Sequence, residues 1–200
     1  MRGILLALLS LVMLVAGCGG GNTKPTPAAT QTIASSSPLS ASALYAALRD
    51  TPVRQDELPA GFSLPAKITD TRDPHTVGSL MMQVTGPDGN DLFSYQVYAD
   101  AGAAKKDFDT WRAGFAAEKP GQQYGDTRFI GMVAPEGFDR PAFCDSSEFF
   151  DAAHTYCIVR VDNVIVQGWN ANTAYASEQV GHAEALARAA VKHLLALRDR

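Results

Sequence analysis

Several classes of function are excluded by what this sequence of 200 residues has little of. It holds only three cysteines and no Cys-x-x-Cys pair, so a cysteine-rich zinc site is not expected. It has no block of lysine and arginine, and its formal net charge is −4, which argues against a nucleic-acid partner. Gly-x-Ser-x-Gly, His-Glu-x-x-His and P-loop motifs are missing, and neither a metal nor another cofactor is indicated. We therefore do not expect an enzyme.

The sequence also has no apolar run long enough to span a membrane. Its longest apolar run lies at the N-terminus. Residues 4–16 have Ser10 as their only polar side chain and follow a single basic residue, Arg2. This layout is typical of a secretory signal. The run is shorter than the roughly 20 apolar residues that a membrane-spanning helix needs. We predict that residues 1–17 are a signal peptide.

The signal ends in Leu14-Val15-Ala16-Gly17-Cys18, which resembles the lipobox of bacterial lipoproteins. The resemblance implies cleavage before Cys18 and diacylglycerol on its sulfur, with fatty acyl chains such as palmitate. The chain would then be held at the outer face of the cytoplasmic membrane, or at an outer membrane if the cell has one.

The segment after Cys18 differs in composition from the rest of the chain. Residues 19–38 are rich in Gly, Ser, Thr and Pro, with Ile33 as their only large apolar residue. Such a segment buries too little apolar surface to offset the entropy cost of ordering. We predict that residues 18–38 are the lipidated cysteine and a disordered tether, and that residues 39–200 form a single extracytoplasmic domain.

Two cysteines remain once Cys18 is lipidated. Export places Cys144 and Cys157 in an oxidising compartment, where we expect them to form a disulfide. Closing this loop should stabilise the fold by about 3 kcal/mol. Asp145, Glu148 and Asp151 lie inside this loop, and we interpret them as solvated acidic residues rather than as a metal site.

Helical spacing of apolar residues predicts three helices. A short one covers residues 41–49, and Asp100 is placed to cap a second. The third covers residues 176–198, where we expect His182 and His193 to be exposed. The apolar stripes of the two long helices are Ala104, Phe108, Trp111 and Phe115, and Val180, Ala183, Ala187, Ala190, Val191 and Leu194.

Alternation and β-branched content predict the strands, and the turns predict how they pair. Residues 86–90 and Asp162-Asn163 read as hairpin turns. The order of elements is hairpin, helix, strand, disulfide segment, hairpin, helix. It predicts an α+β fold, a two-layer sandwich in which helices pack on one face of an antiparallel sheet in two hairpin-then-helix units. The expected strands are residues 62–68, 80–85, 92–98, 128–133, 156–161 and 164–169.

One face of these strands carries aromatic rings, amides and a guanidinium over an apolar floor. This composition is typical of a small-molecule cleft or of a protein-binding face. The alternative is a face covered by the N-terminal segment or by residues 121–145, with its rings as ordinary packing. Arg160 would either orient an anionic or polar ligand group or pair with an acid of a neighbouring strand. The candidate residues are Gln96, Tyr98, Tyr156, Arg160, Gln167 and Trp169.

Three features resemble secreted actinobacterial lipoproteins and the extracellular sensor domains of mycobacterial serine/threonine kinases. They are Leu58-Pro59-Ala60-Gly61-Phe62, the Tyr98-Ala99-Asp100 entry into an alanine-rich helix, and Cys144 and Cys157 before Val-rich strands. The resemblance implies extracytoplasmic sensing or carriage of a ligand and supplies no site residue. We therefore predict a lipid-anchored extracytoplasmic ligand-binding or sensory domain. The alternative is an envelope interaction module that associates with itself or with another protein through the same face.

Overall fold

The structure is a computed structural model. Within the described residues, none of the helices is both long and apolar enough to cross a membrane. The signal peptide, Cys18 and the tether predicted above all lie outside the described residues. The structure describes residues 39–71, 73–87, 89–121, 123–124, 127–133, 135, 137–149, 152–172 and 176–200.

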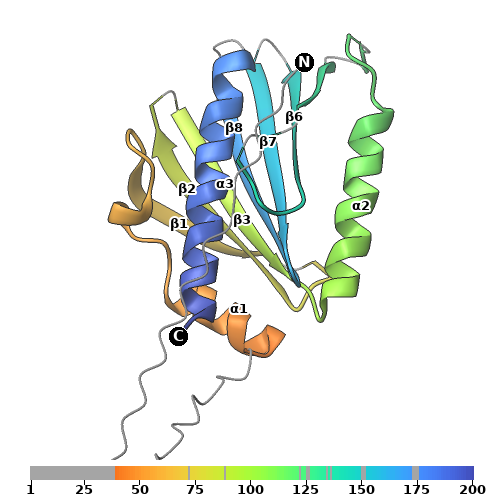
Figure 1. Ribbon diagram of the computed structural model, residues 1–200. Helices are drawn as coiled ribbons and strands as arrows, with labels where there is room; N and C mark the ends of the chain where they lie inside the picture. Colours follow the sequence, from red (N-terminus) through yellow and green to blue (C-terminus); the bar gives the residue numbers. More distant parts are fainter. Residues whose placement is uncertain are drawn as a thin grey trace, which may run out of the picture. The chain divides into compact units, whose positions relative to one another are not determined.

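Eight strands of the described part form one antiparallel sheet (Figure 1). Their order is β1-β2-β3-β8-β7-β6-β5-β4, so the two halves of the chain meet where β3 pairs with β8. The α+β class and the antiparallel sheet are confirmed. The strands are β1 (Ser63–Thr71), β2 (Gly78–Gly86), β3 (Gly89–Val97), β4 (Gln123–Tyr124), β5 (Thr127–Val133), β6 (Ala142–Phe149), β7 (Ala152–Val161) and β8 (Val164–Asn172).

The three predicted helices are present with nearly the predicted bounds. They are α1 (Ala41–Asp50), α2 (Ala101–Ala117) and α3 (Ala176–Arg198), and a short 3-10 helix, η1 (Gln55–Glu57), follows α1. The carboxylate of Asp100 accepts a hydrogen bond from the backbone N–H of Ala103 at 2.8 Å, as its predicted capping role requires.

Helix α3 lies across one face of the sheet (Figure 1). It approaches β8 so closely that a Cβ added at Gly168 would lie 2.2 Å from the carbonyl oxygen of Ala183. Alternate residues of the strands point toward α3, and with the inner stripe of the helix they form the main core. The residues of α3 in this core are Ala183, Leu186, Ala187, Ala190, Val191, Leu194 and Leu197.

Helix α2 lies on the opposite face of the sheet. Its Ala104 and Phe108 pack with Phe143, Ile158 and Ile165 in a second core cluster. These three strand residues alternate with the residues that face α3, so they point the other way. The prediction that the helices cover one face is therefore wrong. The central strands have two apolar faces, and each is covered by its own helix.

Strand β6 is a feature that the sequence analysis did not predict. It occupies the disulfide segment and pairs with β7 in a register that places Cys144 directly opposite Cys157. The predicted disulfide is present, and both cysteines are fully buried. Asp145 follows on β6 and is 2% exposed, so the interpretation of this residue as part of a solvated loop is wrong.

His193 of α3 is buried rather than exposed, with 4% of its surface accessible. Its Nε2 donates to the carbonyl oxygen of Thr51 at 2.8 Å, and its Nδ1 lies 3.1 Å from Oε1 of Glu57. Both partners, a carbonyl oxygen and a carboxylate, are hydrogen-bond acceptors. The segment after α1 covers this part of α3, and this contact fixes that segment to the helix.

Removing the disulfide should lower the free energy of unfolding by about 3 kcal/mol, because a loop of 13 residues no longer constrains the unfolded chain. The paired variant Cys144→Ala/Cys157→Ala is compared with the parent by urea unfolding, with and without reductant. Equal stability of the parent in both conditions would contradict the expectation.

The contact between Glu57 and His193 should contribute to the free energy of unfolding in a way that depends on pH. Burial opposes ionisation of Glu57, but the backbone N–H of Arg54 and the ring of His193 outweigh it and lower the pKa of Glu57. A lowered pKa contributes stability above the ordinary glutamate pKa of about 4.3, and that stability is lost as the pH falls through the folded value. Glu57→Gln should therefore cost about 1–2 kcal/mol at neutral pH and progressively less in acid.

The control for this variant is Asp56→Asn, which removes an exposed neighbouring charge and should leave the unfolding free energy nearly unchanged. Urea unfolding of both variants across the acid range provides the comparison. A deficit of Glu57→Gln that stays constant down to strong acid would show that its charge is not the source of the stability.

Candidate functional site

Helix α2 divides the candidate face into two parts. It crosses β8, β7 and β6 at Ile165, Ile158 and Phe143. In the sheet register, Gln96 and Arg160 lie on either side of Ile165, and Gln167 lies beside Ile158. On β7 the contact at Ile158 lies between Arg160 and Tyr156, and Tyr156 pairs with Trp169 further along the strands. The structure thus does not bring the six predicted residues together in one continuous surface.

Tyr98 belongs to the core under α2. It is 1% exposed, and its hydroxyl donates to Oε1 of Gln96 at 3.0 Å. Burial raises the pKa of Tyr98, and the negative charge of Asp107 on α2 raises it further. The alternative that some of these rings are ordinary packing therefore applies to Tyr98.

Arg160 is half-buried on β7. Its side chain has no hydrogen bond or ion pair with any described residue, and its Nε is buried without an acceptor. Its charge is felt at Asp109 of α2, where Lys105 is the main cause of a lowered pKa and Arg160 a lesser one. The ion pair considered as the alternative for Arg160 is thus not formed with an acid of the described part.

Aromatic side chains run from α2 across the far half of the face. The centroid distances are 5.3 Å between Phe108 and Phe143, 5.7 Å between Phe143 and Phe115, and 6.4 Å between Phe115 and Tyr156. Tyr156 and Trp169, paired across β7 and β8, have centroids 6.3 Å apart. We call these five rings the aromatic band. Phe108 and Phe143 are buried, whereas Phe115, Tyr156 and Trp169 are partly exposed.

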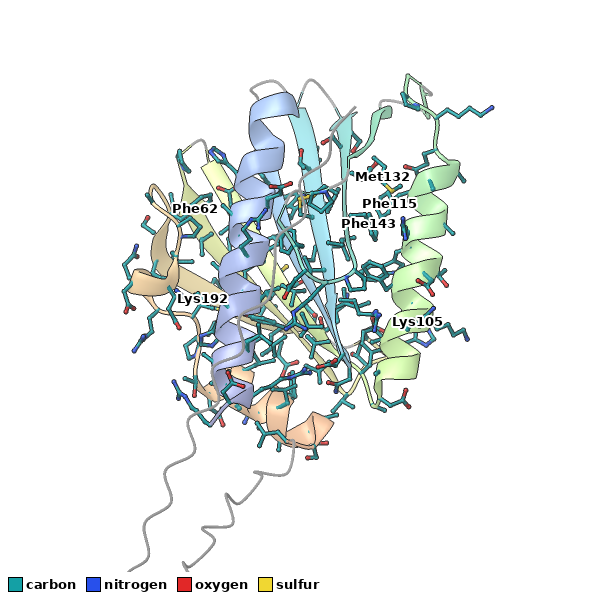
Figure 2. The ribbon with its side chains drawn as sticks, in the orientation of Figure 1. Phe62, Lys105, Phe115, Met132, Phe143 and Lys192 are labelled. Atoms are coloured by element: carbon teal, nitrogen blue, oxygen red, sulfur yellow. A yellow bond between two sulfur atoms is a disulfide. The ribbon has the colours of Figure 1, made fainter. Side chains whose placement is uncertain are left out.

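The outer end of the band lies toward β5. Figure 2 shows Met132, Phe115 and Phe143 on the side of the sheet that faces α2. Met132 is 40% exposed and pairs in register with Asp145. An exposed apolar side chain thus adjoins the partly exposed rings.

Asp145 is the residue of this site that sequence reasoning missed. It lies on the α2 side of β6, in register between Tyr156 of β7 and Met132 of β5. Burial raises the pKa of Asp145 to about 6, and the charge of Glu118, just after α2, adds to the shift. Burial also raises the pKa of Glu118. The sequence signal that could have identified Asp145 is its position two residues after Phe143. In a strand, two residues at this spacing point to the same face.

Polar atoms at the site lack partners. Within the described residues, Oδ1 of Asp145, Oε2 of Glu118 and Nε1 of Trp169 are buried and have no hydrogen-bond partner. Such atoms cost free energy unless something satisfies them. The ring of His154, whose pKa is lowered by burial, lies 5.7 Å from that of Trp169. The arrangement offers two acceptors and one donor beside accessible rings.

Gln167 lies on β8 between Ser94 of β3 and Ile158 of β7. It is half-buried, and Ser94 is 8% exposed. Met81 of β2 continues the same row toward β1. This part of the face is a mixed polar and apolar sheet surface, and it borders the aromatic band at Trp169.

One group of potential metal ligands occurs among the described residues. The sulfurs of Cys144 and Cys157 and a carboxylate oxygen of Glu184 lie within 4.8 Å of one another. The two sulfurs are bonded to each other, so they are not thiolates that bind a metal. The prediction that the protein needs no metal or cofactor stays a prediction.

A hollow of about 550 Å³ lies away from the candidate face, between α1 and the β1–β2 connection. Burial raises the pKa of Tyr45 to about 12 there, and a hydrogen bond to Asp70 contributes. Its other lining residues are Thr71, Asp73, Pro74, Thr76, Val77 and Gly78.

Comparisons with known proteins give a fold likeness and no family. No protein-family model and no curated protein matches the sequence. The extracellular domain of PknH from Mycobacterium tuberculosis is similar over 67% of this chain and 81% of that chain, with a TM-score of 0.45 and 12% identity. No residue here takes a role from that similarity.

Replacing Asp145 by asparagine should stabilise the protein at neutral pH. In the folded protein the pKa of Asp145 is about 6, which exceeds the ordinary value of 3.8. The protein is therefore more stable while Asp145 is protonated, and this stability is lost as the pH rises through about 6 and the buried carboxyl group ionises. One pKa unit corresponds to about 1.4 kcal/mol, so Asp145→Asn should gain about 1–3 kcal/mol above pH 6 and little near pH 4.

The matched control is Asp50→Asn, an exposed aspartate of α1 whose pKa is lowered by Arg49. It should show no such gain. Urea unfolding at the two pH values tests both variants. A loss of stability in Asp145→Asn at neutral pH would mean that the carboxylate has a stabilising partner.

Proposed function

We propose that this chain is a lipid-anchored extracytoplasmic domain that binds a small molecule at the outer half of the aromatic band. The observation that carries the proposal is the conjunction of partly exposed rings and buried polar atoms without partners. Phe115, Tyr156 and Trp169 offer apolar contact, while Asp145 and Trp169 offer an acceptor and a donor. Mostly apolar sites with a few converging polar groups are typical of ligand binding.

The extracytoplasmic location is supported by the disulfide. Cys144 and Cys157 are buried beneath α3 and bonded to each other, and structural disulfides belong mainly to oxidising compartments. The lipid anchor on Cys18 rests on the resemblance of residues 14–18 to a lipobox. Detection of a mass consistent with diacylglycerol on an N-terminal Cys18 peptide tests it.

The second candidate function is a protein interaction module that uses the same surface. Met132 favours it, because this side chain is 40% exposed and extends the apolar area of the rings to β5. Exposed apolar patches of this kind also serve protein association.

Native mass spectrometry of the full chain, made in an oxidising compartment and kept in mild detergent, separates the two candidates. A monomer with an added small mass supports ligand binding, and that mass characterises the ligand. A dimer without added mass supports the interaction module. A bare monomer under conditions that retain known ligands in a reference lipoprotein would contradict a tightly held ligand.

Trp169→Ala should remove the added mass and leave thermal stability nearly unchanged, because Trp169 is partly exposed and its Nε1 has no partner in the described part. Tyr45→Ala truncates a partly buried ring at the hollow beside α1 and should retain the added mass. The opposite pattern would place the ligand beside α1 and contradict the proposed site.

A further inference from the structure

Two carboxylates that form no ion pair with a described cationic residue lie at the outer end of the aromatic band. Asp145 is 2% exposed, and its carboxylate accepts from the backbone N–H of Ser146. Its Oδ1 and the Oε2 of Glu118 are buried and have no hydrogen-bond partner among the described residues. No described lysine or arginine forms an ion pair with either side chain. A buried carboxylate in this state is strongly disfavoured unless a positive charge accompanies it.

The surroundings of the carboxylates are aromatic. Tyr156 is the residue directly opposite Asp145 in the sheet, and Trp169 lies opposite Tyr156 on the next strand. Phe115 contacts Tyr156 from α2 at 6.4 Å between ring centroids. Ring faces attract cations, so rings and carboxylates in one place favour a positively charged group.

We propose that the ligand of this site is an organic cation with N–H donors, a protonated amine, whose ammonium group binds between Asp145 and Glu118 while its apolar part packs on Tyr156 and Trp169. This inference rests on the proposed ligand-binding function. It accounts for both orphaned acceptors, since an ammonium group has up to three donors.

Other occupants fit these residues less well. Hard metal ions take about six to eight oxygen ligands, and the two carboxylates lie among rings that supply few more. An anion would be repelled by Asp145 and Glu118. Arg160, which suits an anion, is two residues beyond Ile158 on β7, on the other side of the contact with α2. A single added proton satisfies only one of the two acids.

Among the described residues, the ionisable groups near Asp145 are Glu118, whose charge raises the pKa of Asp145, and Tyr156, its partner in the β6–β7 pair. A cation binds the ionised carboxylate, so amine affinity should fall as the pH drops through about 6. By reciprocity, a bound amine should lower the pKa of Asp145.

The test compares benzylamine with benzyl alcohol, which has nearly the same shape but no charge. Both are titrated into the full chain by calorimetry at about pH 8, where benzylamine is protonated. We expect benzylamine to bind about tenfold more tightly than benzyl alcohol. Asp145→Asn should abolish this preference without weakening the binding of the alcohol, and Glu118→Gln should reduce it. Asp50→Asn, with the same loss of charge on α1, should retain it.

The outcomes separate this inference from the proposed function. Equal binding of the two probes, or a preference that survives in Asp145→Asn, overturns the amine while leaving a ligand site at the rings. If neither probe binds, but native mass spectrometry shows an added ligand mass that Trp169→Ala removes, the amine proposal is overturned and the ligand site at the rings remains. Absence of binding with no added mass overturns both. Because Asp145→Asn is expected to be more stable than the parent, a lost preference in that variant is not explained by misfolding.

Discussion

Helix α3 lies against the backbone of β8 at Gly168, where a single added carbon would collide with the carbonyl of Ala183. The contact stripe of the helix is alanine-rich, which allows this approach. Beneath the same helix lies the disulfide, which holds β6 to β7. With Cys144 fixed toward α3, its neighbour Asp145 has to point to the opposite face. The position of the acid at the candidate site thus follows from packing on the far side of the sheet.

The two hairpin-then-helix units do not form a symmetric pair. Strands β3 and β8 are antiparallel neighbours, and a two-fold axis relating them runs perpendicular to the sheet. Such an axis would leave α2 and α3 on the same face, yet they lie on opposite faces. Helix α2 buries only Ala104 and Phe108 completely, and its later aromatic residues stay partly exposed. The less complete packing of α2 is what leaves rings accessible at its C-terminal end.

Local patterns were enough to predict the helices, the two hairpins and the disulfide, because each depends on nearby residues: the cap at Asp100, the turn at Asp162-Asn163, the spacing of Phe108 from Ala104. Strand β6 was not predicted, because Asp145-Ser146-Ser147 within it is as polar as a loop and its burial comes from long-range pairing with β5 and β7. The burial of His193 likewise depends on a segment 142 residues away in sequence. Of the six predicted site residues, Tyr156 and Trp169 share the aromatic band, and alternation alone could not show that α2 separates them from Arg160.

Asp145 is difficult to explain by stability alone. An asparagine has nearly the same volume and would carry no charge, and the apolar neighbours Phe143 and Met132 gain nothing from a carboxylate. Glu118 adds a second acid where like charges oppose each other, which raises the free energy of the ionised pair further. Local destabilisation of this kind is typical of binding sites. A ligand that neutralises the charge removes the destabilisation, and the free energy recovered in this way adds to the binding of the ligand. The rings beside the acids are held by the sheet and α2, so the site is shaped before the charge is neutralised.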